Sequence, residues 1–167
     1  MLSALLAPGA DLADPQQVGA GESVLAWAEA TDGTVVAGSR DALYVGAVRL
    51  PWEQVEAVDW DRDADLLRIS EVGTWGQERA EHAFSFDDPG RLLQLVRERV
   101  TASVVLQRHV VVEGRRGLRV IARRAPRGDR PVAWFYEYDE GVDPADPAVR
   151  EAAENALSAA REELGQR

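Results

Sequence analysis

The stretch VRLPWEQVEAVDWDRDADLLRI, Val48 to Ile69, holds two Trp residues and four Asp residues within one short segment. Proline forces the residue before it into an extended conformation, so Pro51 marks a boundary between two strands. Trp52, Val55 and Val58 then recur at a spacing of three, which suits either one helical turn or a bulged strand. The segment therefore predicts a strand, a change of direction, and a second strand that ends in the polar turn DRDAD before LLRIS.

The aspartates in this segment also raise the possibility of a calcium site. Asp59, Asp61 and Asp63 occupy the first, third and fifth positions of an EF-hand loop. The sixth position is Ala64 where glycine is needed, and the twelfth is Ser70 where a bidentate glutamate is needed. We therefore expect a hairpin turn here and predict neither a metal nor any other cofactor.

Short strand-like segments with turn residues between them dominate the rest of the chain. They alternate or carry β-branched and aromatic residues, as pleated, half-buried strands do. An Asp32-Gly33 turn separates the first two. The predicted strands are ESVLAWAEA (22–30), TVVAGS (34–39), ALYVG (42–46), VRL (48–50), LLRIS (66–70), ERAEHAFSF (78–86), a hairpin within 103–126, and VAWFYEYDE (132–140).

Two helices are predicted. In DDPGRLLQLVRERV (87–100), Asp88 can cap the first turn, Pro89 suits the first helical position, and an apolar stripe consists of Leu92, Leu93, Val96 and Val100. The last helix begins after Asp143-Pro144 or Asp146-Pro147. Its stripe is mostly alanine, so the helix should lie close against a sheet; the stripe residues are Val149, Ala152, Ala153, Ala156, Leu157, Ala160 and Leu164.

Composition limits the class of protein. The chain has 167 residues, 46% of them hydrophobic, and no Cys, which excludes disulfides, thiolate metal sites and cysteine nucleophiles and fits a reducing cytoplasm. No segment is predicted to span a membrane or to direct export. The net charge of −10 should repel nucleic acid and anionic lipid at long range. All basic residues are Arg, a composition that indicates a high-GC bacterial genome.

The one basic region, residues 101–142, has 5 acidic residues and 8 Arg. If EGRRG turns the hairpin and Glu113 pairs with Gly117, one face is core and consists of Leu106, Val110, Val112, Leu118, Val120 and Ala122. The other face is solvated and consists of His109, Arg119, Ile121 and Arg123. A phosphate or nucleic-acid surface at 108–130 would use Arg115, Arg116, Arg119 and Arg123, flanked by Arg127 and Arg130.

The alternative for these arginines is neutralisation across the sheet. Glu137 and Asp139 of the next strand would then pair with Arg119 and Arg123, which we favour because exposed cross-strand ion pairs are common. Trp134, Tyr136 and Tyr138 on the opposite alternation are expected to form a core face rather than a base-stacking platform.

The two histidines are the remaining candidates for catalysis. His82 and His109 each stand in a strand-like run without a second histidine or a nearby nucleophile, so a partly solvated strand position is expected for both. A hydrolase-type enzyme would need one of them within about 3 Å of a carboxylate in a concave pocket.

Three short phrases resemble bacterial pleckstrin-homology-like domains of actinobacterial type, over residues 22–100. These phrases are Gly21-Glu22, Asp41-Ala42-Leu43-Tyr44 and Leu50-Pro51-Trp52. The resemblance implies an α+β fold with a pleckstrin-homology-like antiparallel barrel or pair of sheets, plugged by the helix that follows Asp88. Residues 1–21 would be an N-terminal arm, and residues 101–167 would add a three-stranded sheet and a C-terminal helix.

The function that the resemblance implies is non-enzymatic binding or scaffolding. The first hairpin loop offers Asp32 and Gly33 where a phosphate-binding loop would carry basic residues, so a protein partner or self-association is expected ahead of lipid. Nucleic-acid binding through the Arg-rich hairpin is the first alternative. An enzyme that uses His82 or His109 is the second.

Overall fold

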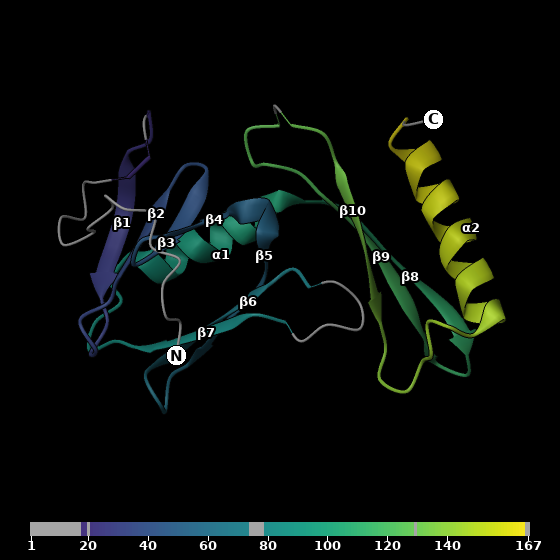
Figure 1. Ribbon diagram of the computed structural model, residues 1–167, viewed down its shortest axis with the longest axis horizontal. Helices are drawn as coiled ribbons and strands as arrows, with labels where there is room; N and C mark the ends of the chain where they lie inside the picture. Colours follow the sequence, from purple (N-terminus) through teal and green to yellow (C-terminus); the bar gives the residue numbers. More distant parts are fainter. Residues whose placement is uncertain (1–17, 20, 74–78, 129, 166–167) are drawn as a thin grey trace. The chain divides into compact units, whose positions relative to one another are not determined.

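The computed structural model describes residues 18, 19, 21–73, 79–128 and 130–165, which form an α+β fold of three antiparallel sheets and two helices (Figure 1). Two units are distinguished: the first runs to Ser103 and includes Ala125–Arg127, and the second comprises Val104–Arg124 and the residues from Gly128 onward. Most of the predicted N-terminal arm lies outside the described residues. So does Glu78 of the predicted strand 78–86.

The first sheet has four strands in sequence order: β1 (Val24–Glu29), β2 (Val35–Ser39), β3 (Ala42–Val45) and β4 (Val48–Pro51). The predicted turn between the first two strands is confirmed. The carboxylate of Asp32 accepts a hydrogen bond from the amide of Thr34 (2.8 Å), and Gly33 has a φ of +86°, a conformation that costs glycine little.

The spacing of three after Pro51 predicted either a helical turn or a bulged strand, and the structure contains both in succession. Pro51 ends β4, a short 3-10 helix η1 (Trp52–Gln54) follows, and β5 (Val55–Asp61) begins with a register irregularity between Val55 and Ala57. The turn buries Trp52 and Val55 completely. The chain thus changes direction at Pro51 and starts a second sheet instead of widening the first.

The second sheet pairs β5 with β6 (Leu66–Glu71) and β6 with β7 (Glu81–Ser85). The predicted DRDAD turn is confirmed, because the Asp61 carboxylate accepts hydrogen bonds from the amides of Asp63 (3.0 Å) and Ala64 (3.1 Å). These contacts replace missing backbone partners at the tip of the hairpin.

Helix α1 (Leu92–Ser103) begins later than the capping pattern predicted. The Asp88 carboxylate does accept an amide hydrogen bond, but from Gly90 (2.8 Å), in a turn before the helix. Gly90 has a φ of +51°, which a right-handed helix cannot contain, so the helix starts only after it. Leu92 and Val96 of the predicted stripe are buried in the core, Leu93 and Val100 pack at its margin, and Leu95 is buried as well.

Helix α1 packs against β1, β2 and η1, and also against β5 of the second sheet. One core therefore includes residues of both sheets and of the helix, among them Leu43, Leu67 and Phe86. The predicted alternative of a barrel is wrong in its closed form: within the described residues the strands stay in two sheets. The physical reason is the turn at Pro51–Gln54, which separates β4 from β5.

The second unit contains a sheet in the order β10 (Ala133–Tyr138), β9 (Arg116–Arg123), β8 (Val104–Glu113). The predicted pairing of Glu113 with Gly117 is wrong, because Glu113 pairs with Arg116 across a two-residue turn whose Gly114 has a φ of +60°. An irregularity between Val111 and Glu113 adds a second one-residue shift, so the pairing beyond it differs from the predicted one by two residues, and each residue keeps its face. The predicted core face is therefore retained, with Leu118 and Val120 buried and Leu106, Val110 and Val112 packed beside them.

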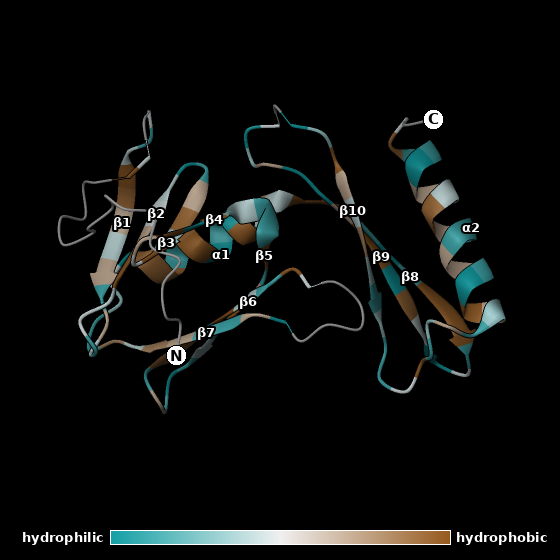
Figure 2. Cartoon of the chain, in the orientation of Figure 1, coloured by the Kyte–Doolittle hydropathy of each residue, from teal (hydrophilic) through white to brown (hydrophobic). Residues whose placement is uncertain are grey.

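Helix α2 (Pro147–Glu163) covers this face by packing on β8 and β9. Of the two predicted starts, the one at Asp146-Pro147 is correct: Asp146 caps the helix by accepting a hydrogen bond from the amide of Ala148 (2.7 Å). Val149, Ala153, Ala156 and Ala160 are buried as predicted. Figure 2 shows brown and teal bands alternating along α2, as expected for one apolar stripe on an otherwise polar helix.

Candidate functional site

The four arginines predicted as a phosphate surface have different environments. Arg115 and Arg116 are exposed at the β8–β9 turn, and Arg119 is half-buried on β9. Arg123 is only 4% exposed, and Ile121 is 5% exposed. The predicted solvated face is therefore wrong at the end of β9, the central strand of the sheet, flanked by β8 and β10. Of these four arginines, only Arg115 and Arg116 are exposed.

The predicted neutralisation of Arg119 is confirmed. Arg119 stands opposite Glu137 in the β9–β10 register, and its guanidinium lies 3.2 Å from the Glu137 carboxylate. Asp139, the second predicted partner, has a different role: its Oδ2 accepts a hydrogen bond from the amide of Gly117 (2.8 Å) and lies 2.9 Å from Nε2 of His109. The hydrogen bond with His109, and then that from Gly117, hold the pKa of Asp139 below its usual value.

Gly117 is needed for this arrangement for a steric reason. A Cβ at this position would lie 1.8 Å from the backbone oxygen of Val110, a contact that no side chain can make. The close approach of β8 and β9 leaves the Gly117 amide directed at Asp139. The cluster of His109, Asp139 and Gly117 thus fastens the end of β10 to the hairpin, in addition to the ladder hydrogen bonds.

His82 was expected on a partly solvated strand, but the structure buries it. Its exposure is 4%, its Nε2 lies 2.6 Å from a carboxylate oxygen of Glu71, and its Nδ1 is buried without a hydrogen-bond partner among the described residues. Glu71 lies on β6, one alternation beyond Ile69, which stands opposite His82 in the register. Both histidines therefore have the carboxylate partner that an enzyme would require.

The pocket described next to the start of α2 contains neither histidine. It has a volume of about 330 Å³ and is lined by Val112, Glu113, Gly141, Val142, Asp143, Asp146, Ala148 and Val149. The carboxylates of Asp143 and Asp146 already accept hydrogen bonds from the amides of Ala145 and Ala148. Neither histidine therefore lies at this pocket.

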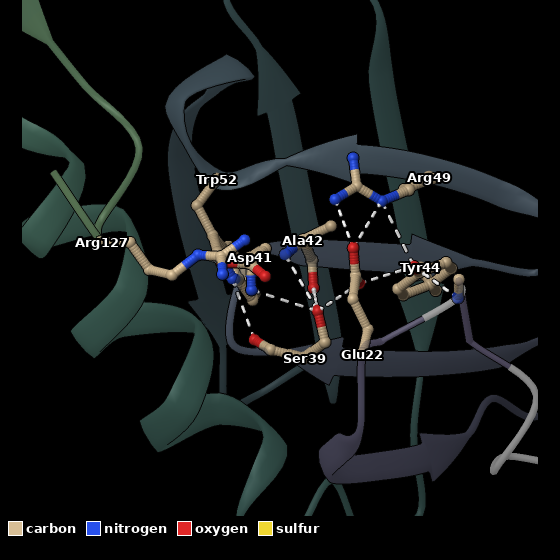
Figure 3. A network of polar contacts seen from close by, with 9 residues as sticks. Glu22, Ser39, Asp41, Ala42, Tyr44, Arg49, Trp52 and Arg127 are labelled. Carbon is tan, nitrogen blue, oxygen red and sulfur yellow. Dashed lines mark hydrogen bonds and ion pairs between the residues drawn. The ribbon is translucent and has the colours of Figure 1, made fainter. Parts of the chain in front are cut away.

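A polar network that the sequence did not reveal joins the residues around Glu22 (Figure 3). The Glu22 carboxylate accepts hydrogen bonds from the hydroxyls of Tyr44 (2.6 Å) and Ser39 (2.7 Å) and from the guanidinium of Arg49. The Tyr44 hydroxyl in turn accepts one from the amide of Gly19 (3.0 Å). These contacts fasten the segment before β1 to strands β2, β3 and β4, and we call them the Glu22 network.

Electrostatics in the Glu22 network favour the charged carboxylate. Burial by itself would raise the pKa of Glu22, but the hydrogen bonds from Tyr44, Arg49 and Ser39 outweigh it and hold the pKa below its usual value. Burial and the hydrogen bond to Glu22 raise the pKa of Tyr44. Since the partners are mutually satisfied, the network stabilises the fold and offers no reactive group.

The three phrases that carry the family resemblance meet at the Glu22 network. Ser39 Oγ accepts hydrogen bonds from the amides of Asp41 (3.2 Å) and Ala42 (3.0 Å). The Trp52 indole donates to the Ser39 carbonyl (3.0 Å), and the amide of Trp52 donates to the Asp41 carbonyl (3.2 Å). Glu22, the Asp41–Tyr44 phrase and Trp52 are thereby held together by Ser39, a buried residue that no sequence pattern singled out.

Strand β1 carries the other feature that the sequence did not reveal. Leu25 and Trp27 are 47% and 49% exposed, respectively, although both are large and apolar. They stand two residues apart and so lie on the same side of β1, an edge strand of the four-stranded sheet. Alternation predicted a strand here, but only the sheet order shows that it is an edge.

Other types of site receive no support in the part of the chain that the structure describes. Among those residues there is no group of three or more metal-ligating side chains, and no helix long and apolar enough to cross a membrane. Comparison with known proteins finds no family model that matches this chain and no curated protein that matches it.

Proposed function

We propose that this protein is a non-enzymatic binding module of the cytoplasm that recognises another protein chain, built on a pleckstrin-homology-like first unit. Support for the fold family comes from the order of four strands, three strands and a helix that packs against both sheets. The meeting of the three family phrases at the Glu22 network adds to it. These features concern the architecture and leave the ligand to the surface chemistry.

The observation that carries protein binding is the exposure of Leu25 and Trp27 on an edge strand. An edge strand presents unpaired backbone groups that an extended chain can satisfy, and exposed apolar side chains beside it supply the affinity. Tryptophan is among the residue types most enriched at energetically important contact positions. A phosphate group would gain nothing from these side chains.

Charge argues against a lipid head group or a nucleic acid. The loop between β1 and β2 contains Asp32, whose carboxylate is engaged with the amide of Thr34, and no basic residue. The Arg-rich hairpin has one predicted contact paired with Glu137 and another buried, which leaves Arg115 and Arg116 at the turn. Two exposed arginines at this turn would bind a polyanion weakly, because the net charge of −10 repels it at long range.

Photocrosslinking in cells that express the full chain tests this function. A photoreactive phenylalanine analogue in place of Trp27 should yield discrete protein adducts, because that position lies at the proposed contact surface. The matched control places the same analogue at Glu151, an exposed position on α2 outside this surface. Absence of adducts at Trp27, or equal adducts at both positions, would contradict a protein-binding surface at β1.

A further inference from the structure

We infer that β1 is a self-association surface, on which the β1 strand of a second copy of this chain pairs in antiparallel orientation. This inference rests on the proposed function and names its partner. The amide of Ala30 donates to the carbonyl of Thr34 (2.8 Å), so this pair is of the hydrogen-bonded type.

The hydrogen-bonding type alternates along an antiparallel pair, and this fixes the direction of the β1 backbone groups. The register continues from Ala30 through Ala28 opposite Val36 and Ala26 opposite Gly38, so the backbone groups of Ala28 and Ala26 point toward β2. Those of Trp27 and Glu29 point away from it. Thr31, the next residue of this set, already donates to the Ser85 carbonyl (2.8 Å).

No other described strand takes up the outward groups of Trp27 and Glu29, since β1 ends the strand order of its sheet. Figure 1 shows β1, drawn in purple, at the margin of its sheet beside β2. An extended chain is the occupant that satisfies alternating donors and acceptors at a strand edge. The occupant is therefore a strand rather than a helix or a small molecule.

The sequence of β1 lacks most of the devices by which edge strands prevent pairing. From Ser23 to Ala28 it contains no charged residue and no proline. The one irregularity lies between Val24 and Ala26 and makes Leu25 the additional residue on β1. From Ala26 onward the register with β2 is regular, Trp27 and Glu29 are exposed, and no other described strand pairs with this edge.

Self-complementarity favours a second copy over a foreign strand. Antiparallel pairing about a two-fold axis at Ala26 sets Leu25 opposite Trp27 of the other copy, twice, so that the two exposed apolar side chains cover each other. The same register places the two Glu29 side chains at opposite ends of the ladder, opposite Ser23. The charge that β1 carries is thus kept away from its own copy.

Charge also predicts how the association responds to salt. Each copy has a net charge of −10, so two copies repel each other at long range while the paired strands themselves are nearly neutral. Added salt screens this repulsion and should strengthen the dimer. A foreign strand recognised by its basic residues would show the opposite dependence.

Sedimentation velocity of the purified full chain over a wide concentration range tests the inference. We expect a reversible monomer–dimer equilibrium whose dissociation constant decreases between roughly 0.05 and 0.5 M salt. The change Trp27→Lys should raise the dissociation constant by about tenfold or more, because it puts two charges into the ladder. The matched control Val48→Lys, on the opposite edge strand β4, changes a residue that is 38% exposed and should leave the equilibrium intact.

Hydrogen exchange on the unmodified chain provides a measurement that needs no variant. The amides of Trp27 and Glu29 should become protected as concentration rises, whereas exchange at exposed positions of α2 should not change. A chain that stays monomeric throughout, or a dimer that Val48→Lys breaks and Trp27→Lys does not, would overturn the inference. A monomeric chain that still yields Trp27 adducts with a different protein would overturn the second copy as occupant but leave the proposed function standing.

Discussion

Replacing Trp52 with alanine should destabilise the first unit by about 4–5 kcal/mol. The side chain is completely buried and belongs to the core that both sheets and α1 form. Its indole also donates a hydrogen bond to the carbonyl of Ser39 (3.0 Å), in the residue that holds the Glu22 network together. Truncation therefore removes packing and leaves a buried carbonyl without this donor.

The two contributions can be separated by a second variant. Truncating a buried aromatic residue to alanine costs about 3–5 kcal/mol, and leaving a buried acceptor unsatisfied costs about 1–3 kcal/mol, with overlap between the two. Trp52→Phe keeps most of the ring volume and loses the N–H donor, so it should cost about 1–3 kcal/mol. A typical domain has a total stability of only about 5–15 kcal/mol, so Trp52→Ala should leave the first unit marginally stable.

Urea denaturation followed by far-UV circular dichroism measures these differences without relying on tryptophan fluorescence. The control is Trp27→Ala at low protein concentration, because Trp27 is 49% exposed and its loss should cost less than about 1 kcal/mol. If the two units unfold in separate transitions, only that of the first unit should shift. A cost for Trp27→Ala equal to that of Trp52→Ala would refute the assignment of Trp52 to the core.

Three further outcomes follow from the polar contacts. The pKa of Glu22 is lowered in the folded chain, so the ionised carboxylate stabilises the fold at pH values above the ordinary pKa of glutamate. This stabilisation is lost as the pH falls through the pKa of the folded state. Glu22→Gln should therefore destabilise the protein most near neutral pH and progressively less in acid, which denaturation at several pH values would measure. Asp61→Ala should lower the free energy of unfolding by about 0.5–1 kcal/mol because two amides lose their acceptor, whereas Asp63→Ala should change it by less than about 0.5 kcal/mol. A calcium-dependent rise in melting temperature that both changes abolish would contradict the assignment of these aspartates to a simple hairpin turn. Fluorescent oligonucleotide should not bind measurably at about 0.15 M salt; micromolar binding that Arg115→Glu with Arg116→Glu abolishes would instead make the hairpin turn a functional site.

Local chemistry was sufficient to predict most of the strands and turns. Asp32-Gly33 turns the first hairpin, Asp61 supports the second, and Asp146-Pro147 starts the last helix, each through contacts within a few residues. Such contacts depend on sequence spacing alone, so a single chain reveals them. The alanine stripe of α2 likewise predicted a helix packed on a sheet.

Prediction failed at two local turns and at one position whose burial depends on neighbouring strands. The capping pattern at Asp88 was present, but the left-handed Gly90 delayed the helix. The hairpin register differs from the predicted one by two residues, because the turn took two residues and an irregularity near Val111 shifted the pairing by one more. Alternation identified both faces of β9, yet it did not reveal that the face bearing Arg123 is buried at its end. Burial depends on the neighbouring strands, and the alternation within one strand carries no information about them.

The candidate sites show the same division. The sequence determined the residue types: an acidic chain without cysteine, two isolated histidines, an Arg-rich hairpin and strands with large apolar residues. Only the tertiary structure decided that Ser39 joins three separate phrases, that His82 is buried against Glu71, and that β1 is an edge with Trp27 in solvent. Composition and periodicity are properties of one segment, whereas strand order and the partners of a polar group are set by segments that the fold brings together from distant positions in the chain.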